Sequence, residues 1–180
     1  MEKRIEFISP EEFALLLKEV KRRKDKELEV AIILGFGSGL RISEIVGYKR
    51  KDKKPIPPLT PDKIDLEKHQ IRIDDAKGNK WRITPTSPAL KPEHVKLLPL
   101  KIQRRNLQYK FTNLAKKVLN KKMSIHILRH GFGNYCVNVK KMPLTMVQGF
   151  MGHSSIAVTG VYAKANPEEA IKEYWRSIND

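Results

Sequence analysis

Hydrophobic residues recur at helical spacing along most of this chain. The first run follows the segment SPEE (9–12), in which Ser9 can cap a helix and Glu12 can close a capping box. Apolar residues at 13, 16, 17 and 20 then share one face, which predicts a helix that ends in the basic run 21–24. The segment 27–36 is apolar almost all round and predicts a buried helix. A short third helix is predicted over 42–46.

The middle of the chain departs from helical spacing. Residues 48–61 are rich in lysine and proline, which predicts a solvated loop. The turn signal AKGNK (76–80) predicts a hairpin, and the prolines between 85 and 99 mark an irregular stretch. Alternating apolar residues predict three short strands, carried by Ile64 and Leu66, by Ile71 and Ile73, and by Trp81 and Ile83.

Helical spacing returns after residue 100. Apolar positions from Leu107 to Leu119 outline a basic helix of about five turns. Pro143 opens another helix that ends near Gly152, and NPEE (166–169) repeats the capping signature before a last helix. The inner stripe of that last helix is Ile171, Tyr174, Trp175 and Ile178. Between these helices, Ser124 can cap a helix whose buried side is Leu128, Phe132, Tyr135, Cys136 and Val139.

The predicted elements describe an α+β protein: a mostly helical domain with a small antiparallel three-stranded sheet. The chain has 180 residues, for which one domain is the prior expectation. Its formal net charge is +16 and its pI is about 9.9. Such an excess of positive charge favours a polyanionic partner, which could be DNA, RNA or an acidic membrane surface. Charge alone does not separate these partners, or distinguish them from a merely basic protein.

Cysteine content and hydropathy indicate the cellular compartment. Cys136 is the single cysteine, so no disulfide framework exists and a reducing compartment is favoured. No apolar run reaches membrane-spanning length. We therefore expect a soluble, intracellular protein, in the cytoplasm and associated with DNA, or in the host cytoplasm if a virus or plasmid encodes it.

Arg41 is the first candidate for phosphate chemistry. It follows a glycine-rich turn at the mouth of a short helix, where a guanidinium beside free N–H groups suits a phosphate. A glycine-flanked arginine is more often a surface residue. Glu44, three residues on, could buttress Arg41, although a local surface ion pair is equally consistent with this spacing.

The segment HILRH (126–130) carries the second group of candidates. His126 and Arg129 share one helix face, as do His126 and His130, and the first two flank the predicted buried side. They are therefore placed to point into a cleft, and a basic solvated face is the competing interpretation. His-x-x-x-His is also a zinc spacing, but Ile127 stands where a zincin has Glu and no acidic or cysteine cluster completes a site. We predict no metal.

Two further candidates can move or attack atoms at phosphorus. Lys77, near the tip of the predicted hairpin, could protonate a leaving oxygen, a role for which Lys80 competes. Tyr162 lies among small residues, which favours an accessible hydroxyl over a packed ring. With an ordinary pKa near 10, its hydroxyl needs a proton acceptor or nearby positive charge to become a nucleophile.

These segments together resemble the catalytic domain of the tyrosine recombinase (phage integrase) family. The matching residues are GLRISE (39–44), KGNK (77–80), HILRH (126–130), GHSS (152–155) and Tyr162, in the order and spacing of the family. The resemblance covers essentially the whole chain and implies that residues 1–180 form one catalytic domain. It also implies that the family's N-terminal DNA-binding domain is missing from these residues.

The resemblance implies a role for each candidate residue. Tyr162 would attack the scissile phosphate, leaving a 3′-phosphotyrosyl link and a free 5′-hydroxyl. Arg41 and Arg129 would hold the non-bridging oxygens as negative charge builds in the transition state. The other three roles are Lys77 as general acid, His126 in proton transfer, and His153 as a hydrogen-bond donor to the phosphate.

Cofactors and partners follow from the same resemblance. The arginines and Lys77 supply the positive charge, and the phosphotyrosine stores the energy, so no metal, ATP or other cofactor is implied. Double-stranded DNA would be the partner, with self-association as a dimer or tetramer on DNA, and neither a membrane nor a small-molecule substrate is expected. The last helix would pack either on a neighbouring protomer, as in the family, or on its own core.

The chain departs from the family pattern in two places, and other functions are compatible with it. Residues 48–61 form a longer link than usual, and TPTSP (84–88) replaces a more regular strand end. A type IB topoisomerase would share the phosphotyrosine chemistry but swivel one strand instead of exchanging two. A non-catalytic basic DNA-binding module would bind without a covalent adduct. An RNA-binding protein is less favoured, since no aromatic-rich strand is visible.

Overall fold

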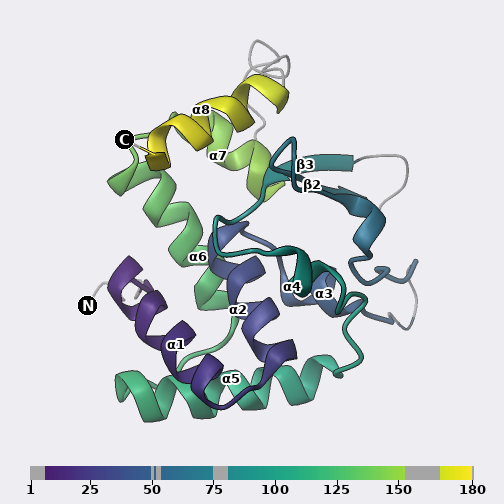
Figure 1. The fold of residues 1–180 in the computed structure, drawn as a ribbon, viewed down its shortest axis with the longest axis vertical. Helices are drawn as coiled ribbons and strands as arrows, with labels where there is room; N and C mark the ends of the chain where they lie inside the picture. Colours follow the sequence, from purple (N-terminus) through teal and green to yellow (C-terminus); the bar gives the residue numbers. More distant parts are fainter. Residues whose placement is uncertain (1–6, 50, 52–53, 75–80, 153–166, 180) are drawn as a thin grey trace.

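The computed structural model describes residues 7–49, 51, 54–74, 81–152 and 167–179. Within these ranges the chain is mostly helical (Figure 1). It also contains one antiparallel sheet of three strands. The α+β architecture predicted from the hydrophobic pattern is therefore confirmed. No helix among the described residues is both long and apolar enough to span a bilayer.

The N-terminal helices form as their capping residues predict. Helix α1 (Pro10–Arg22) begins with the expected capping box: the N–H of Glu12 donates to the Ser9 hydroxyl at 3.2 Å, and the N–H of Ser9 donates to the Glu12 carboxylate at 3.1 Å. Helix α2 (Lys26–Gly37) is buried from Leu28 to its end and runs through the centre of the domain (Figure 1). Helix α3 (Ile42–Val46) follows the glycine-rich turn.

The sheet lies beside α3. Strands β1 (Ile64–Asp65), β2 (Gln70–Asp74) and β3 (Trp81–Pro85) are hydrogen-bonded in that order, all antiparallel. The prediction that Leu66 belongs to the first strand was wrong. The Asp65 side chain accepts the N–H of Lys68 at 2.8 Å and closes a turn there, which ends β1 before Leu66.

The proline-marked stretch after β3 contains a short helix that the sequence did not predict. Helix α4 (Pro92–Val95) places proline in its first turn, where the missing N–H costs nothing. His94 is buried there. Its Nδ1 accepts the N–H of Lys91 at 3.0 Å, and its Nε2 lies 3.2 Å from a carboxylate oxygen of Glu29 on α2. These contacts fix the stretch against the core.

The C-terminal half contains four further helices, α5 (Arg104–Leu119), α6 (His126–Asn134), α7 (Leu144–Met151) and α8 (Pro167–Asn179). Helix α6 begins with Ile125 at its N-cap rather than Ser124, although the Ser124 hydroxyl still accepts the N–H of His126 at 3.4 Å. It continues as a π-helical turn (Tyr135–Val139), whose wider winding changes the helical phase. The prediction that Val139 is buried was therefore wrong: its side chain is 53% exposed.

Two apolar clusters form the core and meet at α6. The larger joins α1, α2, α5 and the sheet, and the smaller joins the end of α6 to α7 and α8. In this structure the stripe of α8 packs on its own domain. Tyr174 is buried, its ring lies near that of Phe132, and its hydroxyl donates to the Gly37 carbonyl of α2 at 3.3 Å. Helices α7 and α8 thus cover one end of the sheet (Figure 1).

Two glycines are predicted to respond to alanine with opposite signs. Gly39 has φ of +67°, and an added Cβ would lie 2.5 Å from Cδ1 of Phe132. Strain and overpacking should make Gly39→Ala less stable by about 2 kcal/mol or more. Gly149 lies inside α7 with nothing within 4 Å of its Cβ position, so Gly149→Ala should add about 0.5–1 kcal/mol. Urea unfolding of both variants tests this, and equal effects would contradict it.

Candidate active site

Three arginines converge on the C-terminal end of α7. The carbonyls of residues 150–152 belong to the last turn of the helix, where carbonyl oxygens lack helical partners and carry partial negative charge. Each accepts a bond from a different element: Arg82 of β3 bonds Phe150 at 2.8 Å, Arg129 of α6 bonds Met151, and Arg41, the N-cap residue of α3, bonds Gly152 at 3.5 Å. The helix end therefore gathers three cations.

Glu44 links two of these arginines. Its carboxylate accepts two bonds from Arg82, at 2.9 and 2.8 Å, and one from the Arg41 guanidinium at 2.9 Å. It also accepts the backbone N–H of Arg41 at 2.8 Å. The side chain of Glu44 is only 8% exposed, whereas that of Arg41 is 35% exposed. The predicted Arg41–Glu44 pair is thus present, and its acidic partner is buried beneath the surface.

The ion pairs determine the charge of Glu44. Burial alone would raise the pKa of this carboxyl, but the hydrogen bonds and charge of Arg82, with the charge and backbone N–H of Arg41, outweigh burial. The net effect holds the pKa of Glu44 below its ordinary value. Glu44 is therefore a carboxylate at neutral pH.

Arg129 is buried more deeply than its position on α6 predicted. It was expected to flank the buried side, but the residue is only 5% exposed. Its guanidinium donates to the Gly39 carbonyl at 2.6 Å and to the Met151 carbonyl, and no described carboxylate bonds it. Burial, followed by the charge of Arg41, lowers the pKa of Arg129 to about 9. Both causes disfavour the charged form of Arg129, so a bound anion would stabilise that charge.

His126 lies within reach of these charges. It is the first residue of α6 and is exposed. Partial burial lowers its pKa first, followed by the positive charges of Arg104, His130, Arg129 and Arg41. The lowered pKa favours the neutral imidazole of His126, which can accept a proton. The structure thus brings together three of the predicted site residues, Arg41, His126 and Arg129.

The three other predicted residues, Lys77, His153 and Tyr162, lie outside the described residues. Their roles stay predictions. Gly152 is the last described residue before 153–166, and it contacts the arginines directly. Its φ is +59°, and a Cβ there would lie 2.7 Å from Cδ of Arg82. Only glycine fits this position without displacing Arg82.

Two arginines of this region were not predicted from the sequence. Arg82 alternates along β3 with Trp81 and Ile83, and strand alternation alone assigns such a charged residue to solvent. Arg104 is the first residue of α5, and its guanidinium lies 4.5 Å from the ring centre of Tyr48. Basic residues in the first turn of a helix oppose its dipole, which was a usable signal for Arg104.

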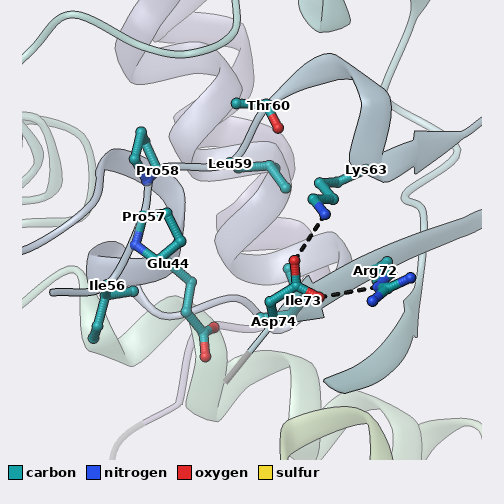
Figure 2. Close-up of a pocket in the computed structure, with 10 residues that line it drawn as sticks. All are labelled: Glu44, Ile56, Pro57, Pro58, Leu59, Thr60, Lys63, Arg72, Ile73 and Asp74. Atoms are coloured by element: carbon teal, nitrogen blue, oxygen red, sulfur yellow. Dashed lines mark hydrogen bonds and ion pairs between the residues drawn. The ribbon is translucent and has the colours of Figure 1, made fainter. Parts of the chain in front are cut away.

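A small cavity lies on another side of Glu44. Its volume is about 140 Å³, and Figure 2 shows Glu44 at one side, with the ion pairs of Asp74 with Lys63 and Arg72 at the other. Arg41, His126 and Arg129 do not line it. The described residues also contain no group of three or more histidine, cysteine, aspartate or glutamate side chains placed to hold a metal ion. The clustered arginines and His126 are therefore the better candidate site.

Comparison with known proteins identifies the C-terminal half of the chain. A family model described as the phage integrase family matches residues 91–169. We call residues 91–169 the integrase segment. This integrase segment contains His126 and Arg129, whereas Arg41 and Arg82 lie before it.

Similarity extends beyond the integrase segment. The tyrosine recombinase XerA of Thermococcus kodakarensis is 25% identical over 183 residues, covering 88% of this chain and 60% of that protein. Among solved structures, a XerA recombinase superposes with a TM-score of 0.62 at 20% identity, covering 97% of this chain and 65% of that chain. The Tn1549 transposon integrase, solved with a circular intermediate DNA, gives a TM-score of 0.62 at 20% identity, covering 97% and 66%.

The chain has the fold of a tyrosine recombinase, as the resemblance implied. It spans about 60% of the length of the curated recombinases that it matches.

Acid should affect the Glu44 centre in a defined pH range. Because the folded pKa of Glu44 lies below the ordinary 4.5, its ion pairs stabilise the protein above that pH and this contribution is lost as pH falls below it. Glu44→Gln should cost about 3 kcal/mol at pH 7, and the difference from wild type should shrink toward pH 3. Urea unfolding at both pH values tests this, with the exposed Glu93→Gln as control. A difference that is independent of pH would contradict it.

Proposed function

We propose that this chain is the catalytic domain of a site-specific DNA recombinase or integrase, which cleaves and rejoins strands through a covalent 3′-phosphotyrosyl intermediate. The observation that supports this most is the convergence of buried Arg129 and half-buried Arg41 on the end of α7, beside His126. Glu44, already bonded to Arg82, does not bond Arg129. The centre therefore carries positive charge that a phosphodiester can neutralise.

Double-stranded DNA is the proposed substrate. The formal net charge of +16 provides the long-range attraction that phosphate backbones require. A relative of the same fold, the Tn1549 transposon integrase, was solved in complex with DNA. We expect the protein to act where the DNA of its cell lies, associated with the nucleoid, and to self-associate as a dimer or tetramer on its substrate.

The proposed reaction exchanges one phosphoester for another. The Tyr162 oxygen forms a bond to phosphorus, and the bond from phosphorus to the 5′-oxygen breaks. Lys77 gives a proton to that oxygen, producing a free 5′-hydroxyl, and the tyrosine proton leaves to a neighbouring base. Rejoining is the same exchange in reverse, with the 5′-hydroxyl of a partner strand as nucleophile. The number of phosphoester bonds is unchanged, so ATP is not consumed.

Electrostatic stabilisation is the proposed task of the arginines. Negative charge on the non-bridging oxygens grows as phosphorus becomes five-coordinate, and donors fixed in advance stabilise this state. Arg129 is fixed by the carbonyls of Gly39 and Met151, and Arg41 by Glu44 and Gly152. His126 would take part in proton transfer, and His153 would donate a hydrogen bond to the phosphate.

A covalent adduct tests the nucleophile. We expect that supercoiled plasmid quenched with detergent after incubation carries covalently attached protein, and that Tyr162→Phe binds DNA but forms no adduct. Relaxation without preference for a target sequence would instead indicate a type IB topoisomerase. Binding without an adduct in the wild type would indicate a non-catalytic DNA-binding module. Cleavage by Tyr162→Phe would refute the assignment of the nucleophile.

Removing either arginine should slow cleavage far more than it weakens binding. Arg41→Ala and Arg129→Ala should each lower the single-turnover rate about 10²- to 10³-fold, the usual effect of losing one transition-state donor. Arg22→Ala is the matched control, because the Arg22 side chain is 66% exposed on α1 and pairs only with Glu19 among described carboxylates. Rates within threefold of the control, a threshold of about 0.7 kcal/mol, would contradict the proposed roles.

A further inference from the structure

Arg82 is the most completely bonded of the three arginines at the end of α7. Its Nε donates to the Phe150 carbonyl at 2.8 Å, while Nη1 and Nη2 donate to the two oxygens of Glu44 at 2.9 and 2.8 Å. Its side chain is 14% exposed, against 35% for Arg41. Because every nitrogen of its guanidinium has an acceptor inside the protein, Arg82 is not placed to bind a substrate.

The two parallel bonds from Arg82 to Glu44 limit the number of bonds that Glu44 can accept from Arg41. Parallel bonds from both terminal nitrogens to both carboxylate oxygens are the strongest arginine–carboxylate geometry. Arg82 occupies that geometry, so the Arg41 guanidinium reaches Glu44 through Nη1 alone, at 2.9 Å. Without Arg82, the buried carboxylate would have Arg41 as its nearest cation, with Arg129 close enough for its charge to be felt. It would then neutralise the charge that a phosphate needs.

We propose that Arg82 is a positioning residue of this centre: by occupying Glu44, it leaves the charge of Arg41 and Arg129 available to a phosphate. The inference rests on the proposed function and identifies the residue that sets the charge of that site. Arg82 touches no reacting atom in this role and acts through Glu44.

Strand β3 holds Arg82 in this position. Thr84 lies two residues along the same face, is fully buried, and donates to the Ser38 carbonyl at 2.6 Å. At the other end of the guanidinium, Arg82 bonds Phe150 and packs closely against Gly152. The residue therefore also fixes the turn of α7 whose carbonyls receive Arg129 and Arg41.

A double-variant cycle separates this role from ordinary structural support. Arg82→Met should lower the single-turnover cleavage rate at saturating DNA about 100-fold, the effect of a small misplacement of catalytic groups. Glu44→Gln alone should also slow cleavage, because Arg41 loses its ion pair. The double variant should nevertheless cleave about tenfold faster than Arg82→Met, because no carboxylate is left to neutralise Arg41. Because removing both partners of a buried ion pair can also restore stability, rates are compared at a temperature where all four proteins are folded. A merely structural Arg82 then predicts no difference between Arg82→Met and the double variant.

The same four proteins should be compared in an equilibrium measurement. Inorganic phosphate at constant ionic strength should raise the unfolding temperature of the wild type and the double variant more than that of Arg82→Met. Arg82→Lys keeps the charge without the two parallel bonds and should cleave about tenfold slower than wild type, which provides a test if Arg82→Met does not fold. Arg22→Met is the control for loss of an exposed arginine and should match wild type.

Each outcome is decisive. Slow Arg82→Met with a faster double variant supports the inference, as does the same order in the phosphate series. Arg82→Met or Arg82→Lys at the wild-type rate overturns it, and so does a double variant no faster than Arg82→Met. If the wild type forms no adduct, the proposed function fails, and the phosphate series alone then decides the role of Arg82.

Discussion

Burying cations side by side is unfavourable, and the structure around this site is organised to make it possible. Arg41, Arg82 and Arg129 meet at the end of α7, where each finds a backbone carbonyl. The last carbonyls of a helix have no N–H partner within the helix. Here the arginines donate to them, so both the carbonyls and the guanidinium groups are hydrogen-bonded. Glu44 adds one full negative charge. Three guanidinium groups against one carboxylate leave the centre with a net positive charge.

This requirement explains features of the fold that lie far apart along the chain. Gly39 adopts a left-handed conformation that presents its carbonyl to Arg129 while its missing side chain admits the ring of Phe132. Gly152 has a left-handed conformation too, and its missing side chain admits Arg82. Apolar side chains of α6, α7 and α8 pack together and stabilise the same region. Glycine thus occupies the two positions where a larger side chain would collide with Phe132 or Arg82.

The sequence predicted what depends on local rules. The capping box of α1, the apolar face of α2 and the alternation in β2 follow from neighbouring residues, and all are present. Short motifs also pointed to Arg41, His126 and Arg129, which the structure places in one region. Arg82 was not predicted, since its partners lie 38 and 68 residues away and no local pattern encodes that meeting. Helix α4 and the π-helical turn escaped prediction for a similar reason, because packing decides them.

The sequence distances inside the site also determine when it can exist during folding. Arg129 bonds one carbonyl 90 residues before it and another 22 residues after it, and Arg41 reaches across 111 residues to Gly152. Contacts of such separation form late, after the loops between them have closed. A chain still being synthesised therefore lacks the bonds that bring all three arginines together until α7 has emerged and docked. The complete cluster of positive charge forms only after that step.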